Sequence, residues 1–337
     1  MSSKANLAFF HSQNRGLRTA APEDDYLHPQ ANAEVSDDSL TETQYFGICM
    51  PEQRIHGLLY CWHHPNLKTV SGGAWVWQGM KTHALQCEIF DWRSFMSDRP
   101  LRNDLHSYRL DNGYGVDVVE PLKRHRVTYS DASRGNAFDL EYEAVAPPVV
   151  WADGKHFEQT MKVRGSLTLR GKQYEVNGYN VRDRSWGKPR PEAHMNIPPV
   201  NWMTGVFGDD LHFMCTATDH PELKPDWLKL YPDYPAERTL MGGWLQKGGE
   251  LLEIVSCRKR TVRNQSTLFV ERIELSLVDS KGGTHEMVGE PLALSPLVAW
   301  PNTYIVTALI RWRYAGRTGH GDSQEMQLYD FVRALSQ

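Results

Sequence analysis

The ten residues from Gly178 to Gly187 carry the groups in this chain that are best suited to chemistry. The segment contains β-forming residues and ends in a glycine, so it predicts a strand. Alternation along a strand places four residues on one face: Tyr179, Val181, Asp183 and Ser185. If this face is apolar, loss of hydration favours the neutral form of the Asp183 carboxyl, which then becomes a proton donor near neutral pH. Asp183 is therefore a candidate catalytic acid, with Tyr179 as a group that could relay a proton or orient a substrate.

A structural role for Asp183 is also open. Its neighbours Arg182 and Arg184 are cations that can neutralise a carboxylate in a buried ion pair. The residue types alone do not decide between a catalytic and a structural role for Asp183.

Upstream, the segment His156-Phe157-Glu158-Gln159 offers a second titratable pair, because histidine and glutamate can exchange protons with one another. A surface loop after Asp153-Gly154 would show the same residues, so His156 and Glu158 are either a proton-exchanging pair or part of such a loop. His156 is the third catalytic candidate. Trp75 and Trp77 alternate onto one face and either line a pocket or fill a core, and Trp202 is a further candidate for substrate contact.

Composition excludes several classes of function. The net charge of −4, from 37 basic and 41 acidic residues, gives no long-range attraction for nucleic acid. No apolar run approaches the ~18 residues of a membrane span, and no signal-peptide pattern opens the chain. The five cysteines are widely spaced and never form a CxxC pair, which favours a reducing compartment. We expect a cytoplasmic protein without a nucleic-acid partner or a membrane span.

Cofactor and metal motifs are also missing from the sequence. There is no glycine-rich nucleotide loop, no HExxH and no GxSxG. The adjacent His63 and His64 would point to opposite faces of a strand and so could not jointly bind one metal ion. We therefore expect neither an organic cofactor nor a metal centre.

Short runs of β-forming residues alternate with turn signals from about residue 44 onward, which is typical of a sandwich or barrel. One predicted hairpin turn lies at Arg170-Gly171-Lys172. Prolines between residues 188 and 199 interrupt this pattern, since proline cannot donate to a strand ladder. The sequence predicts an all-β protein with little helix: an irregular arm over residues 1–43, a β-domain over 44–195 and a second over 196–337.

Four blocks around the central strand carry a family resemblance: His156-Phe157-Glu158-Gln159, the segment from Arg164 to Gly171, the segment from Tyr174 to Gly178, and Arg182-Asp183-Arg184-Ser185-Trp186-Gly187. They resemble a bacterial group related to the carotenoid hydratases and to the tandem-lipocalin (calycin-like) superfamily, in which an Asp-x-x-Trp-Gly ending recurs. The resemblance implies two consecutive antiparallel lipocalin-like β-barrels with a pocket at or near their junction. Relatives include hydratases of isoprenoid double bonds and fungal pericyclases.

In those hydratases an aspartate is thought to protonate the alkene, and Asp183 and Trp186 occupy the matching motif. A histidine often follows the aspartate in relatives, whereas this chain has Arg184. Arginine cannot shuttle protons, but it could bind a carboxylate or carbonyl of the substrate. The resemblance thus implies a cofactor-independent lyase, hydratase or isomerase that acts on the double bond of a hydrophobic small molecule such as a terpenoid or steroid. A template-type cyclase and a non-catalytic carrier of hydrophobic ligands remain alternatives.

Overall fold

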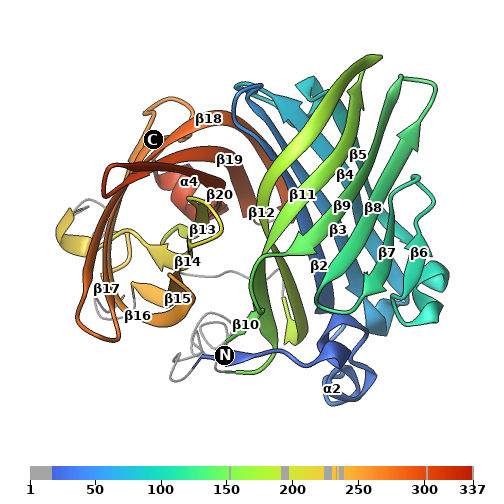
Figure 1. Ribbon diagram of the computed structural model, residues 1–337, viewed down its shortest axis with the longest axis horizontal. Coiled ribbons are helices and arrows are strands. Elements are labelled where there is room, and N and C mark those ends of the chain that lie inside the picture. Colours follow the sequence, from blue (N-terminus) through green and yellow to red (C-terminus); the bar gives the residue numbers. More distant parts are fainter. Residues whose placement is uncertain are drawn as a thin grey trace. The chain divides into compact units, whose positions relative to one another are not determined.

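The computed structural model describes residues 17–151, 153–190, 197–223, 230–232, 234, 239–300 and 303–335. It contains two compact units, traced in Figure 1. The N-terminal unit comprises residues 18–78 and 85–191, and the C-terminal unit contains residues 79–84 and 192–337. Antiparallel strands dominate both, and the described residues form only two short α-helices, α2 (Pro29–Ala33) and α4 (Tyr329–Leu335). The predicted all-β class is confirmed.

The N-terminal unit is a single curled antiparallel sheet of twelve strands. Along the sheet the strands follow in the order β5 (Ile89–Ser97), β4 (Thr69–Gln78), β3 (Ile55–His64), β2 (Leu40–Met50), β12 (Lys172–Pro189), β11 (His156–Leu169), β9 (Asn136–Ala144), β8 (Arg124–Asp131), β7 (Gly115–Glu120) and β6 (Ser107–Arg109). The short strand β10 (Val149–Val150) pairs with β11 and with β1 (Arg18–Thr19).

Side chains on the concave face of this sheet form one apolar core that includes Phe46, Val76 and Leu140. Within the described part of the chain the edge strands β5 and β6 are not paired with each other. Side-chain hydrogen bonds connect the two ends of the sheet instead. Asn112, in the turn between β6 and β7, donates through its Nδ2 to the carbonyl oxygens of Gly72 (3.0 Å) and Asp91 (2.8 Å).

The substitution Asn112→Ala is expected to lower the free energy of unfolding by about 1–3 kcal/mol, because it removes two buried hydrogen bonds to backbone carbonyl groups. Urea denaturation measures this change. Asn66 provides a matched control, since its Nδ2 also donates to two backbone carbonyls but at an exposed site. Equal losses of unfolding free energy for Asn112→Ala and Asn66→Ala would contradict the role given to Asn112 in joining the two ends of the sheet.

The C-terminal unit contains a closed eight-stranded barrel (Figure 1). Its strands are β13 (Val200–Val206), β14 (Leu211–Thr218), β15 (Leu240–Lys247), β16 (Glu250–Arg263), β17 (Val270–Asp279), β18 (Thr284–Trp300), β19 (Thr303–Tyr314) and β20 (Arg317–Leu328). Phe213, Leu275 and Trp312 belong to its core, and the Trp312 indole donates to the Thr204 carbonyl at 2.7 Å. An eight-stranded barrel of this kind is just wide enough for side chains to fill.

A tight two-residue turn at Arg170 and Gly171 joins β11 to β12, as predicted. Both residues have positive φ (50° and 81°), which matches the twist of a hairpin. No bulge interrupts the pairing of β11 with β12, so this turn sets the register along the full length of the hairpin. It places Glu158 opposite Asp183 and His156 opposite Ser185.

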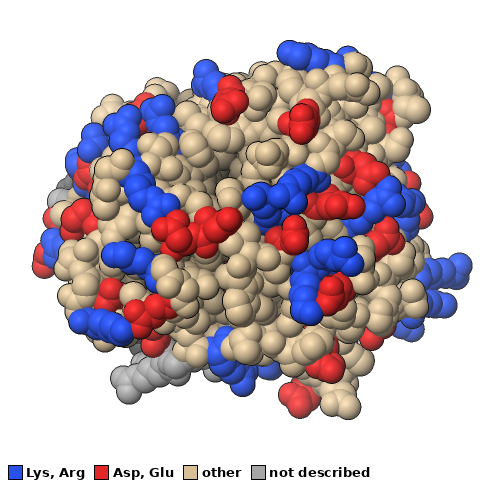
Figure 2. Space-filling view, viewed as in Figure 1, with Lys and Arg blue, Asp and Glu red and all other residues tan. Residues whose placement is uncertain are grey.

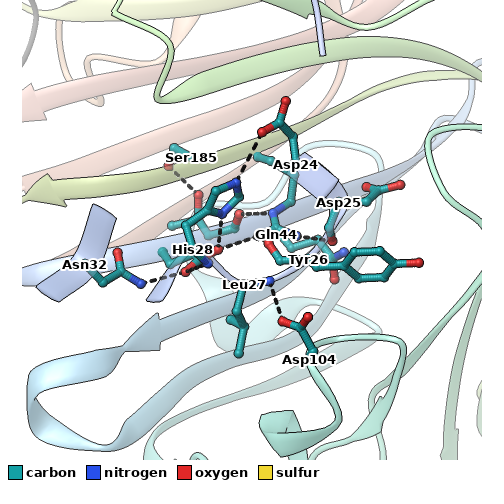
Figure 3. A network of polar contacts seen from close by, with 12 residues as sticks. Asp24, Asp25, Tyr26, Leu27, His28, Asn32, Gln44, Asp104 and Ser185 are labelled. Atoms are coloured by element: carbon teal, nitrogen blue, oxygen red, sulfur yellow. Dashed lines mark hydrogen bonds and ion pairs between the residues drawn. The ribbon is translucent and has the colours of Figure 1, made fainter. Parts of the chain in front are cut away.

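Of the segment predicted as an irregular arm, residues 1–16 lie outside the described residues. From residue 17 the segment contains β1, the 3-10 turn η1 (Pro22–Asp25) and α2, and β2 starts at Leu40. Figure 3 shows how polar contacts fix it: the His28 imidazole and the Asn32 amide both bond to the Glu42 carboxylate, each at 2.8 Å.

Basic and acidic side chains are interspersed on the surface seen in Figure 2. Among the described residues, no helix is both long and apolar enough to cross a membrane.

Candidate functional site

The two arginines beside Asp183 point away from it, into the N-terminal unit. Arg182 is fully buried and pairs with Asp25 at 2.6 Å, and Arg184, equally buried, pairs with Glu42 at 2.6 Å. Alternation along β12 puts Asp183 on the opposite face. In the described part of the chain, Asp183 takes part in no ion pair with either arginine, so the structural alternative raised by the sequence is not the observed arrangement.

A cross-strand row of side chains contains Asp183. Tyr60 of β3 pairs with Tyr45 of β2, Tyr45 pairs with Asp183 of β12, and Asp183 pairs with Glu158 of β11. Trp92 of β5 extends the row, because its ring stacks on Tyr60 with centroids 5.8 Å apart. We call these five residues the Asp183 row. It brings one carboxyl group to a set of aromatic rings and to a second carboxyl group.

The next row on the same face contains His156. Trp62 of β3 pairs with Thr43 of β2, Thr43 with Ser185 of β12, and Ser185 with His156 of β11. The hydroxyls of Thr43 and Ser185 are 2.6 Å apart. His156 is the diagonal neighbour of Asp183, a relation that keeps side chains within reach of one another.

Burial raises the pKa of Asp183 to about 6, even though the residue is only half-buried. The nearby Glu158 carboxylate adds to this rise, while His156, Arg190 and Arg184 oppose it. Burial also raises the pKa of Tyr60, so its phenol keeps its proton. The Asp183 carboxyl group therefore keeps its proton up to a higher pH than an ordinary aspartate does.

The raised pKa predicts that Asp183→Asn gains stability relative to the wild type as the pH rises from about 4 to about 8. A carboxyl with a raised folded-state pKa contributes stability below its unfolded pKa of about 4 and loses it as the pH rises through about 6. Asparagine carries no charge and so avoids that loss. Urea unfolding at about pH 4 and about pH 8 should show the variant gaining roughly 1–3 kcal/mol on the wild type between these values. A difference independent of pH would contradict the raised pKa.

The remaining candidates from β12 lie away from Asp183. Tyr179 shares its face but sits four residues along the strand, about 13 Å away, with the Lys162 ammonium 5.7 Å from its ring. Arg184 is on the opposite face, enclosed by the arm. Trp186 is stacked on His28 with a centroid distance of 3.8 Å and is 4% exposed. These contacts give Arg184 and Trp186 roles in holding the arm.

Three tryptophans proposed from the sequence lie outside both rows. Trp75 and Trp77 of β4 are fully buried with rings 4.6 Å apart. Trp75 donates to the Cys87 sulfur at 3.1 Å, and Trp77 makes an edge contact with His56 at 4.9 Å. Trp202 is a buried residue of β13 in the C-terminal unit.

The sequence patterns did not indicate Tyr45, Tyr60 or Trp92 as site residues, and they indicated Glu158 only as a partner of His156, a contact that the structure contains at 2.7 Å. A signal for Glu158 was present, because a two-residue turn at Arg170-Gly171 already pairs it with Asp183. The tyrosines come from β2 and β3, whose pairing with β12 joins distant parts of the chain. No local pattern marks such a pairing.

Several solved structures have a similar fold. Kievitone hydratase from Nectria haematococca has 12% identity and a TM-score of 0.51, with 93% of this chain and 96% of that chain covered. CghA has 10% identity and a TM-score of 0.54 over 86% and 89%. A protein from Nitrosomonas europaea has 12% identity and a TM-score of 0.51 over 91% and 96%. At such identities the likeness concerns the fold, and it confirms the predicted calycin-like arrangement.

No curated protein matches this chain in sequence. A family model does match, and it spans residues 21–328, which include every strand that contributes to the two rows. The chain therefore belongs to the family described as Domain of unknown function (DUF7064).

Proposed function

We propose that the protein is a cofactor-independent enzyme that adds water to, or removes it from, the double bond of a hydrophobic small molecule, with Asp183 as the acid. The proposal rests on the environment of Asp183. Its carboxyl is half-buried, lies on the face opposite both arginine ion pairs, and has a pKa raised to about 6. It also sits in a row of aromatic rings, where an apolar substrate would be favoured over water.

In the hydration direction, the Asp183 carboxyl gives its proton to one carbon of the double bond. The second carbon becomes cationic, and the ring faces of Tyr60 and Trp92 stabilise that charge through their quadrupoles. Water then bonds to the cationic carbon and gives up a proton to a base. His156, in the adjacent row, supplies that base and later returns the proton to the Asp183 carboxylate. Dehydration runs through the same steps in reverse.

A test is incubation of the purified protein with a panel of terpenoid, steroid and styrenyl alkenes and the corresponding alcohols, followed by mass spectrometry. A product that differs from its substrate by one water molecule supports the proposal. A ring-closed or rearranged product of unchanged mass would support a template cyclase or isomerase instead. A compound that is retained by the protein and recovered unaltered would support a carrier.

A further inference from the structure

Glu158 has contacts that the proposed acid chemistry at Asp183 does not by itself require. Its side chain is completely buried, yet it has three polar contacts. The Trp151 indole Nε1 lies 2.8 Å from its Oε1 and 2.7 Å from its Oε2, and the His156 Nε2 lies 2.7 Å from its Oε1. Two separate ring nitrogens thus converge on one buried carboxyl group directly opposite Asp183.

The chemistry of these groups fixes where the hydrogens are. An indole N–H can only donate, so the carboxyl oxygens of Glu158 must accept from Trp151. Hydrogen bonds that are donated to a carboxyl group favour its ionised form. An ionised Glu158 can only accept from His156 as well, which places a hydrogen on His156 Nε2. In the neutral imidazole, Nδ1 is then the nitrogen that is free to take a proton.

The ring of His156 is also held in orientation. It packs edge-on against Trp151, with centroids 4.8 Å apart and an angle of 78° between the ring planes. The backbone N–H of Trp151 donates to the His156 carbonyl at 2.9 Å, which ties the segment before β11 to its first residue. The His156 side chain retains 14% exposure, whereas that of Glu158 retains none.

We propose that Glu158 and Trp151 are positioning residues that make His156 Nδ1 the base of this site. This assignment rests on the proposed hydration chemistry and completes its proton cycle. Asp183 loses its proton to the alkene carbon, water forms the new C–O bond, and the released water proton bonds to Nδ1. The imidazolium, stabilised by the Glu158 carboxylate, then returns that proton to the Asp183 carboxylate, so atoms and charge balance over one turnover. A carboxylate that orients an imidazole and stabilises its cation has the same role in hydrolase triads.

Other charged and polar groups lie near Glu158 and His156. Asp183 faces them from β12, and Arg190 follows the end of that strand, where it donates to Ser185 at 2.7 Å. Lys188 is paired with Asp153 at 2.5 Å, and its ammonium lies 5.8 Å from the Trp151 ring centroid. Tyr60 lies in the same row as Glu158 but on β3, three strands away from it. The His156 ring bonds to Glu158, with 2.7 Å between Nε2 and Oε1.

Nitrogen-15 NMR of the histidine side chains tests the assignment without any substrate. In the wild type at about pH 8, where an ordinary imidazole is neutral, we expect His156 to carry its hydrogen on Nε2. In Glu158→Leu, which removes both acceptor oxygens, the His156 ring should lose its preference for the tautomer with hydrogen on Nε2. Glu175→Gln serves as the control, because Glu175 is an exposed carboxylate eight residues along β12 from Asp183 and should leave His156 unchanged.

A wild-type His156 with its hydrogen on Nδ1, or a Glu158→Leu protein in which His156 keeps the wild-type tautomer preference, would overturn the assignment. The wild-type tautomer is decisive even if the Glu158 variant does not fold. A protein that shows the expected tautomer, and its loss in Glu158→Leu, but alters no alkene would refute the proposed function and leave the positioning of His156 intact.

Discussion

Asp183→Asn is expected to lower turnover by about 10²–10⁴-fold, which is the usual contribution of a positioned general acid. The asparagine amide keeps the shape of the carboxyl group but has no acidic proton to give to the alkene. Binding should change little, because the aromatic rings of the Asp183 row remain. Steady-state kinetics on whichever alkene or alcohol is turned over should therefore show a fall in kcat with KM nearly constant.

Glu175→Gln is the matched control for this experiment, since it removes an exposed carboxylate from the same face of the same strand. It should retain the wild-type rate. Near-UV circular dichroism should show that both variants keep the native tertiary packing. If Asp183→Asn turned over substrate at the wild-type rate, Asp183 would not be the catalytic acid. An equal fall in kcat for Asp183→Asn and Glu175→Gln would show that the loss is not specific to the site.

Arg182→Met is expected to lower the free energy of unfolding by about 3–5 kcal/mol, because removal of one partner leaves a buried charge uncompensated. The Arg182 guanidinium pairs with Asp25 at 2.6 Å and donates to the Gln159 amide oxygen. His125 bonds to the same aspartate at 3.0 Å. Arg182 and His125 hold the pKa of Asp25 far below its usual range, despite burial. The Asp25 carboxylate therefore stays charged, and methionine cannot neutralise it.

Arg126→Met is the control for that substitution. Arg126 makes two hydrogen bonds to Asp139 on the exposed surface of β8 and β9. Exposed pairs of this kind contribute about 0–1 kcal/mol. The double variant Arg182→Met with Asp25→Asn should recover part of the loss, since it removes the unpaired charge. Denaturant unfolding measures all three, and equal losses for Arg182→Met and Arg126→Met would contradict the account of the arm.

Sequence patterns were sufficient for the parts of the site that depend on local pairing. Strand alternation placed Asp183 on the face opposite its two arginines. The hairpin turn at Arg170-Gly171 was also predicted, although the pairing of Glu158 with Asp183 that follows from it was not. The all-β class followed from the spacing of β-formers and turns. The calycin-like fold came from the resemblance carried by the motif that ends in Trp186 and Gly187.

The pairings between distant segments could not be predicted in the same way. Arg184 was a candidate for substrate binding because nothing local shows that Glu42 of β2 neutralises it. Trp186 matched a family motif, yet its ring stacks on His28 of the arm. Tyr45 and Tyr60 enter the Asp183 row only because β2 pairs with both β12 and β3. Periodicity tells which face a side chain occupies, but not which strand will lie beside it.

The proton transfer from Asp183 to carbon can be tested by turnover in deuterated water, with the product analysed by mass spectrometry and NMR. The account predicts one deuterium bonded to the carbon that was protonated, together with the elements of water on its neighbour, in the wild type but not in Asp183→Asn. A product that forms with no deuterium on carbon, or one that Asp183→Asn makes with the same labelling and rate, would contradict it.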